Sequence, residues 1–289
     1  GEREKRRYHF IINRSGQGET LPALFVYSGV LNMKFGICTG LENLELVERL
    51  GYDYIEPSVT GLLALSEEER QMYLEKLNTS RISCEAFNVL FPQEVQLIDG
   101  NMDAEALKQY LDRAMAAVHA FGGQVVVFGS GKCRRCPEHL TMGEAYKKLV
   151  SIYRAAGDAA APYGIEVVIE PLSRSETNMI CTMAEGAILE ADVHHPQVGL
   201  LSDFYHVEMN HDRIQDIETI GRLGHTHIAA AAGRKYPVSE EGEEFEAFFR
   251  SLRVIGYEGR VSIEGKTEDM EADGAKSLKL LKELAARTL

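Results

Sequence analysis

The sequence predicts a single (β/α)₈ barrel with an N-terminal extension, and three observations point to this α/β fold class. From Met33 onward, short apolar runs alternate with longer segments of helical periodicity. We count eight such runs, and eight strand–helix units with right-handed crossovers are the number that closes into a barrel. At 289 residues and 45% hydrophobic, the chain is long enough to bury one core of this size.

An open, doubly wound sheet is the alternative to a closed barrel. Such a sheet normally carries a glycine-rich turn for a dinucleotide after its first strand. The first unit here contains only Gly36 and Gly40, and no Walker A phosphate-binding sequence occurs in the chain. We therefore favour the barrel and expect no nucleotide cofactor.

The predicted strands are short runs rich in β-branched and apolar residues, bounded by turn residues. They cover residues 34–38, 54–59, 82–89, 124–130, 165–171, 198–204, 226–231 and 259–265. Helical periodicity follows at 43–53, 66–80, 103–123, 141–164, 182–195 and 243–259. Several of these segments open on a capping Ser, Thr or Asp and close on Gly, as helices do.

Residues 1–32 differ in composition and pattern from the rest of the chain. Basic residues come first, and the apolar run that follows is broken by Pro22 and Gly29. The broken run and the missing small-residue cleavage site disfavour a secretory signal. We predict an N-terminal extension over 1–32, with a strand pair turning at 14–19, and a barrel domain over 33–289.

The overall charge of the chain limits its partners. It has 31 Lys and Arg against 44 Asp and Glu, a formal net charge of -13, which disfavours nucleic acid and anionic membranes as partners. No apolar run approaches the roughly 18–20 residues that span a bilayer. Five cysteines, an odd number, favour a reducing, cytoplasmic compartment over a disulfide framework. Barrels of this kind often pair, so a homo-oligomer is compatible with the sequence, but no interface can be located.

Polar side chains end four consecutive predicted strands. The fifth strand ends in Glu170, the sixth in Asp203, the seventh carries His227 and the eighth ends in Glu264. In a barrel the carboxyl ends of all strands face one shared mouth, where the chemistry takes place. We therefore expect three carboxylates and one imidazole to meet at one rim.

Three converging carboxylates would repel one another unless a counter-charge lay between them. Oxygen donors with one imidazole suit a hard or borderline cation, so we predict one divalent cation, Mn²⁺ first, with Mg²⁺ or Co²⁺ as alternatives. Each residue taken singly has an ordinary alternative: a capping Asp, a hydrogen-bonded core His, or a Glu paired with Arg. The coincidence of all four at one rim favours the metal site.

Four segments carry a resemblance to a known family. "VVIEPLSRSE" at 167–176, "SDFYH" at 202–206, "LGHTHIA" at 223–229 and "VSIEG" at 261–265 resemble the xylose-isomerase-like sugar isomerase/epimerase superfamily, particularly its D-tagatose and D-psicose 3-epimerase branch. The resemblance runs from Met33 to the C-terminus and is strongest over 165–266. It implies a (β/α)₈ barrel in which the four matching positions, Glu170, Asp203, His227 and Glu264, hold one Mn²⁺, Co²⁺ or Mg²⁺.

The same resemblance implies roles for three further residues. Glu176 and His206 match substrate-binding positions, and Arg234 lies near a family Arg that contacts the sugar. The match at Arg234 is offset by one residue, and the family's Glu between His and Arg is replaced by alanine in "HIAAAAGR". This departure leaves the identity of the sugar open.

Two residues at other strand ends are further candidates for substrate contact. Glu56 ends the second predicted strand and faces the same mouth, where it could bind a substrate hydroxyl or pair with an Arg. Asn88, near the end of the third strand, could supply a polar contact to a sugar. Arg134 and Arg135, after the fourth strand, could meet a phosphate or carboxylate.

These residues predict an enzyme that moves a proton on a sugar. A hydroxy ketone held on a divalent cation has a polarised carbonyl, so a carboxylate can remove the neighbouring carbon-bound proton and leave a cis-enediolate. Glu170 and Glu264 come from different strands and can flank the substrate, and the resemblance implies the same acid/base pair. We expect a metal-dependent epimerase or isomerase acting on a ketose or related keto sugar.

Other functions stay open. An inosose dehydratase or a hydroxypyruvate isomerase of the same superfamily would use the same chemistry. A barrel that binds a sugar without catalysis would fit the alanine run after His227. An AP endonuclease of the same barrel type ranks lower, because it needs more His and carboxylate ligands and a basic DNA-facing surface.

Overall fold

The computed structural model describes residues 8–11, 24–27, 32–98, 100 and 102–287. Its main sheet has eight strands in the order β4-β3-β10-β9-β8-β7-β6-β5, and all seven neighbouring pairs are parallel. The strands are β3 (Lys34–Cys38), β4 (Tyr54–Glu56), β5 (Ala86–Phe87), β6 (Val125–Phe128), β7 (Glu166–Ile169), β8 (Val198–Asp203), β9 (His225–Ile228) and β10 (Arg260–Ile263). The predicted barrel is confirmed.

The barrel closes between β4 and β5 through single contacts instead of a regular ladder. Tyr54 bridges Ser83 and Ser58 bridges Asn88. The Ile55 amide donates to the Ser83 carbonyl at 3.0 Å. Because the ladder is interrupted here, β5 has only two residues, although a longer strand was predicted over 82–89.

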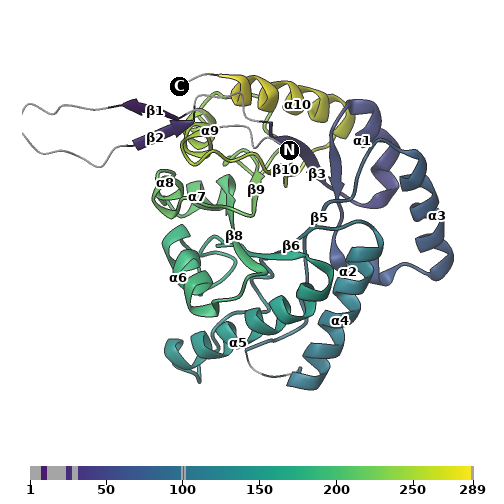
Figure 1. Cartoon of the computed structure of the whole chain (residues 1–289), viewed down its shortest axis with the longest axis vertical. Helices are drawn as coiled ribbons and strands as arrows, with labels where there is room; N and C mark the ends of the chain where they lie inside the picture. Colours follow the sequence, from purple (N-terminus) through teal and green to yellow (C-terminus); the bar gives the residue numbers. More distant parts are fainter. Residues whose placement is uncertain (1–7, 12–23, 28–31, 99, 101, 288–289) are drawn as a thin grey trace, which may run out of the picture.

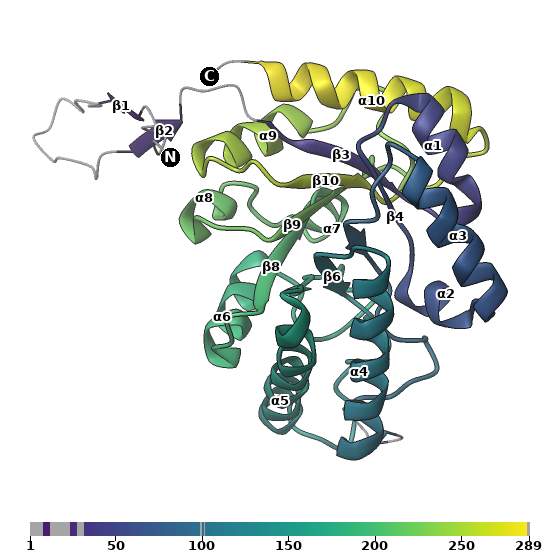
Figure 2. The same ribbon diagram turned by 45° about the vertical axis from the view of Figure 1, so that its right-hand side comes forward.

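Helices surround the sheet on its outer side (Figures 1 and 2). They are α1 (Leu44–Leu50), α2 (Val59–Ala64), α3 (Glu67–Thr79), α4 (Ala104–Ala120), α5 (Met142–Ala160), α6 (Met183–Val193), α7 (Phe204–Met209), α8 (Asp216–Ile220), α9 (Phe245–Val254) and α10 (Met270–Ala286), with two short 3₁₀ segments at Leu41–Asn43 and Ala161–Tyr163. Capping boxes at Ser66, Thr141 and Thr182 start α3, α5 and α6 as the sequence predicts. None of the described helices has the length and apolar character needed to cross a membrane.

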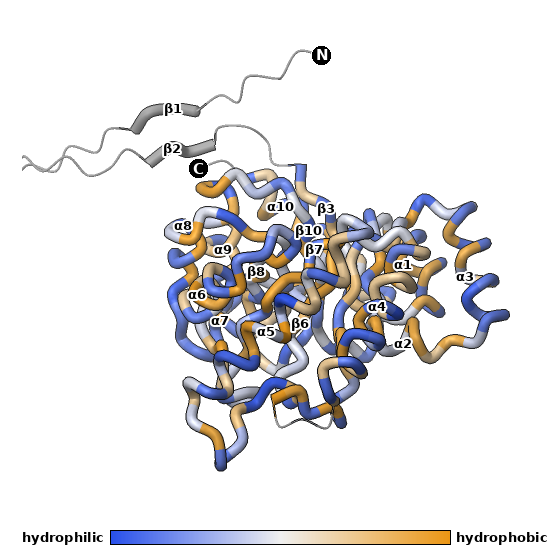
Figure 3. The backbone as a smooth tube through the Cα atoms, turned by 60° about the horizontal axis from the view of Figure 1, so that its bottom comes forward, coloured by the Kyte–Doolittle hydropathy of each residue, from blue (hydrophilic) through white to orange (hydrophobic). Residues whose placement is uncertain are grey.

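The apolar core lies mostly between the strands and the helices. Val167 and Ile169 of β7 belong to this layer, whereas Val168 belongs to a smaller cluster with Val127 and Leu201. Successive side chains of a strand face opposite sides of the sheet, which explains why neighbouring residues of β7 belong to different apolar clusters. By contrast, α3 buries no residue, and Figure 3 shows many hydrophilic positions along it.

In the N-terminal extension, β1 (Tyr8–Ile11) and β2 (Leu24–Tyr27) form an antiparallel pair with Tyr8 opposite Tyr27. A strand pair was predicted in this segment. The predicted turn at 14–19 lies outside the described residues, and the division at residue 33 stays a prediction.

Candidate active site

The four residues predicted to meet at the strand ends do come together. Donor atoms of Glu170, Asp203, His227 and Glu264 all lie within 4.8 Å of one another. His227 Nδ1 is 3.4 Å from Glu170 Oε1 and 3.5 Å from Glu264 Oε2. We call these four residues the rim cluster.

Strand alternation explains why these four side chains converge. Val168 and Leu201 belong to the same apolar cluster, and Glu170 and Asp203 each follow two residues later. Residues two apart on a strand share a face, so each carboxylate points to the same side as the apolar residue that precedes it. A side chain at position 129 would clash with the Glu170 carboxylate, so Gly129 leaves the space that this carboxylate occupies.

Glu56 lies beneath the rim cluster and not in the mouth where the sequence placed it. Its side chain is fully buried, with Oε1 2.9 Å from His227 Nε2 and Oε2 2.8 Å from His225 Nε2. The Ser262 hydroxyl also donates to Glu56. The expected contact with a substrate hydroxyl is therefore wrong, because the side chain is engaged inside the barrel.

This arrangement fixes how His227 presents its ring. Nε2 is held by Glu56, so Nδ1 is the ring atom that faces the rim cluster, and a neutral ring with its hydrogen on Nε2 would offer the Nδ1 lone pair to a cation. His227 Nδ1 and Glu170 Oε1 are buried and have no hydrogen-bond partner among the residues that the structure describes. The two atoms lie 3.4 Å apart without a hydrogen bond between them, and this pair can supply two donor atoms to a bound ion.

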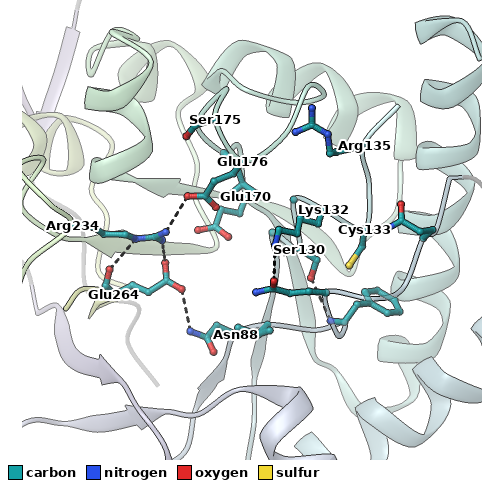
Figure 4. A pocket seen from close by; sticks show the side chains of 17 residues that line it. Asn88, Ser130, Lys132, Cys133, Arg135, Glu170, Ser175, Glu176, Arg234 and Glu264 are labelled. Atoms are coloured by element: carbon teal, nitrogen blue, oxygen red, sulfur yellow. Dashed lines mark hydrogen bonds and ion pairs between the residues drawn. The ribbon is translucent and has the colours of Figure 1, made fainter. Parts of the chain in front are cut away.

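Arg234 is the main cation at the rim. Its guanidinium lies 3.4 Å from Asp203 Oδ2 and 3.3 Å from Glu176 Oε1, and it also donates to the Glu264 carboxylate. Figure 4 shows this arginine between Glu176 and Glu264. The offset in the sequence therefore does not take Arg234 away from the site, and Glu176 lies beside it.

His206 and Asn88 also lie against the rim cluster. The Ser173 amide donates to His206 Nδ1 at 2.9 Å, so the other ring nitrogen is directed at Asp203 Oδ2, 3.6 Å away. Asn88 Nδ2 donates to Glu264 Oε1 at 3.2 Å. Each of the two predicted substrate-binding residues is thus within reach of a ligand at the cluster.

Burial and charge shift the pKa values of the site strongly. Burial, reinforced by the Glu264 charge, raises the pKa of Glu170. Burial and the neighbouring carboxylates likewise raise the pKa of Asp203 to about 7. Burial also acts on Glu264, but His227 and Arg234 outweigh it and lower its pKa to about 2. Burial lowers the pKa of His206 to about 3, which keeps its ring neutral at physiological pH. Such perturbation is typical of functional sites.

Two members of the rim cluster, Glu170 and Glu264, line a cavity of about 660 Å³. A volume of this size suits a small organic ligand. The lining residues are Asn88, Val89, Phe91, Gln93, Gln96, Gly129, Ser130, Gly131, Lys132, Cys133, Arg135, Glu170, Leu172, Ser175, Glu176, Arg234 and Glu264.

His225 and Ser262 are site residues that the sequence interpretation missed. His225 precedes His227 by two positions on β9, so strand alternation puts both rings on one face. Their ring centroids are 5.0 Å apart. The alternating His-Thr-His run was the available signal.

A comparison with models of protein families shows to which family the chain is related. The model of the xylose isomerase-like TIM barrel family matches residues 44–284. The chain belongs to this family. The resemblance seen in the sequence is therefore confirmed.

The chain is also similar to proteins named as sugar epimerases and isomerases. The chain is 27% identical to the 3-dehydro-D-guloside 4-epimerase of Escherichia coli over 82% of its own length and 91% of that protein. It is 31% identical to the 2-oxo-tetronate isomerase of Pectobacterium atrosepticum over 46% of its length and 58% of that protein. The structure of D-allulose 3-epimerase from Methylomonas sp. in complex with D-allulose has a TM-score of 0.75 and 20% identity, covering 88% of this chain and 97% of that one.

Proposed function

We propose that this protein is a divalent-metal-dependent sugar epimerase or isomerase that moves a carbon-bound proton through a cis-enediolate. The observation that carries the proposal is the rim cluster: three carboxylates and an imidazole nitrogen within 4.8 Å of one another, at the end of a cavity. The family and the named relatives support a sugar epimerase or isomerase.

The rim cluster suits a divalent cation. Three oxygen donors and one nitrogen favour Mn²⁺, Mg²⁺ or Co²⁺. The partnerless atoms Glu170 Oε1 and His227 Nδ1 are two of the donors that such an ion needs. We propose Glu170, Asp203, His227 and Glu264 as its ligands. When bound, the ion would polarise the substrate carbonyl and stabilise developing negative charge.

Glu170 and Glu264 are proposed as the acid/base pair. They follow β7 and β10 and reach the cavity from different strands. One carboxylate takes the proton from the carbon next to the carbonyl, and the carbonyl oxygen gains the electron pair as the enediolate forms. For epimerisation the other carboxylate returns a proton to the opposite face of the same carbon.

The neighbouring residues hold the substrate in this proposal. Arg234 and Glu176, which already pair with each other, would bind substrate hydroxyl or carbonyl oxygens. His206 would orient a hydroxyl through its neutral ring, and Asn88 would hold Glu264 in place through its amide. A fixed arrangement of this kind contributes to the rate by orienting the reacting groups.

Solvent deuterium exchange tests the proposal directly. Protein loaded with Mg²⁺ is incubated with a panel of ketoses and keto acids in D₂O and followed by proton NMR. We expect the proton beside the carbonyl of a substrate to exchange. Binding of sugars without exchange across the panel would favour a non-catalytic barrel, and loss of water from an inosose would favour a dehydratase.

A further inference from the structure

The cavity has a second end whose charge is opposite to that of the rim cluster. Lys132 and Arg135 line it from the loop after β6, and Gln93 and Gln96 line it from the loop after β5. Figure 4 shows Lys132 and Arg135 on the side of the cavity away from Arg234 and Glu264. We call these four residues the basic arm.

Buried contacts hold the loop that carries the two cations. Arg134 is fully buried, and its guanidinium donates to the Glu170 carbonyl at 2.5 Å and to the Tyr153 hydroxyl at 2.9 Å. The Cys133 amide donates to the Ser130 carbonyl at 2.9 Å. Arg134 is thus used inside the protein, and of the two arginines noted in the sequence only Arg135 lines the cavity.

The backbone around the basic arm adopts conformations that are costly for the residues present. Ser130 has φ 42° and Val89 has φ 46°, both in the left-handed region, and both line the cavity. A β-branched residue in this region is a clear outlier. Such strain gathers at binding sites, where the surrounding structure maintains it.

Lys132 and Arg135, the two cations of the basic arm, are both exposed. Within the part of the chain that the structure describes, neither Lys132 nor Arg135 makes an ion pair, and Lys132 Nζ donates to the neutral Gln93 Oε1 at 2.9 Å. Lysine and arginine are the side chains that bind phosphate and carboxylate groups, arginine often through two parallel hydrogen bonds. In a chain with a net charge of -13, two such cations beside an acidic site are a local exception.

We propose that the basic arm binds an anionic group, a phosphate or a carboxylate, at the end of the keto sugar away from the carbons that exchange protons. This inference rests on the proposed function and narrows its substrate class to sugar phosphates or sugar acids. The positive charge of Lys132 and Arg135 then sets the direction in which such a substrate enters, with its anionic group toward the basic arm. Lys132 and Arg135 then determine specificity without taking part in proton transfer.

The test compares the double variant Lys132→Gln/Arg135→Gln with the control Lys147→Gln/Lys282→Gln, which removes the same charge from exposed positions on α5 and α10. The kinetic readout is kcat and KM for deuterium exchange on neutral ketoses, ketose phosphates and keto sugar acids. We expect anionic substrates to be preferred by the wild type. In the double variant their KM should rise about 10- to 100-fold with kcat little changed, since each lost contact involves a charged group.

A second readout does not need catalysis. Binding of inorganic phosphate to the metal-free protein, followed by ³¹P NMR, should weaken at least about 10-fold in the double variant and stay unchanged in the control. Unchanged phosphate binding in the double variant would overturn the basic arm whatever the activity. Turnover of neutral ketoses by the wild type that equals or exceeds its turnover of anionic substrates would also overturn it.

The two proposals fail in different ways. If the wild type exchanges no proton on any substrate, the proposed function fails, and phosphate binding still decides whether the basic arm takes an anion. If exchange occurs on ketose phosphates and not on sugar acids, phosphate is the group bound. The reverse result assigns a carboxylate.

Discussion

The two ends of the barrel hold their charges in opposite ways. At the amino ends of the strands, Glu85 accepts from Lys34 Nζ at 2.5 Å and from Arg260 Nε at 2.7 Å. At the carboxyl ends, three carboxylates lie close together. The buried atoms Glu170 Oε1 and His227 Nδ1 have no hydrogen-bond partner among the described residues. The charge pairs at the amino ends stabilise the fold, whereas the carboxyl ends set three carboxylates against Arg234 and His227 and keep binding capacity for a ligand.

The largest expected effect comes from removing a charge at the carboxyl ends of the strands. Glu170→Gln should lower the rate of deuterium exchange by about 10³-fold or more, because it removes a proton-transfer group and a proposed metal ligand together. The matched control is Glu166→Gln, at the amino end of the same strand, where the side chain pairs with Arg222. Equal rates for both variants would show that the two ends do not differ in function.

A smaller effect is expected beneath the rim cluster. Glu56→Gln should weaken Mn²⁺ binding about 10- to 100-fold, because an amide offers one acceptor oxygen where His225 and His227 each need one. Isothermal titration calorimetry measures this affinity. Unchanged affinity, with the fold intact by circular dichroism, would mean that Glu56 does not orient His227.

The same type of substitution should have opposite effects on the stability of the metal-free protein at the two ends. Glu85→Gln should lower the free energy of unfolding by about 1–3 kcal/mol, since it removes the ionic partner of Lys34 and of the largely buried Arg260. Glu170→Gln should raise it, because burial and the Glu264 charge disfavour the ionised side chain, as its raised pKa shows. Urea unfolding in the presence of EDTA measures both free energies of unfolding. If both variants change this free energy in the same direction, the two ends of the barrel do not differ in this respect.

The smallest expected effect is the dependence of the Glu85 ion pairs on acidic pH. Although burial raises the pKa of Glu85, hydrogen bonds from Lys34 and Ser83 and the Arg260 charge outweigh it, so its pKa is lowered on folding. The stabilisation is therefore fully present above the unfolded pKa of about 4.3 and is lost as pH falls through the lower folded value. The stability gap between wild type and Glu85→Gln should narrow below about pH 4.3. A gap that stays constant between pH 7 and pH 3 would contradict the ion-pair assignment.

The sequence was most informative where strand periodicity alone positions a side chain. Glu170, Asp203 and Glu264 end their strands and His227 lies on the strand between the last two, so assigning four consecutive strands was enough to bring these residues together. The count does not show how deep a side chain lies. Glu56 also ends a strand, yet it binds two histidines inside the barrel.

Residues on the loops were harder to predict, because long-range packing determines their positions. The two adjacent arginines at 134 and 135 are equivalent in sequence, yet one is fully buried and the other lines the cavity. The anchors of Arg134 lie at Tyr153 and Glu170, far along the chain. Asp203 takes the capping role that was named as an ordinary alternative, because Oδ1 accepts from the Tyr205 amide at 2.9 Å at the start of α7 while Oδ2 faces Arg234; its role as a metal ligand stays a prediction.

The most direct test of the account is a calorimetric titration of the metal-free protein with Mn²⁺, beside the Asp203→Asn variant. We expect the wild type to bind one ion per chain and the variant, which loses a charged ligand, to bind far more weakly. Saturable binding that is equally tight in both proteins, or no binding by the wild type, would contradict a cation held by the rim cluster.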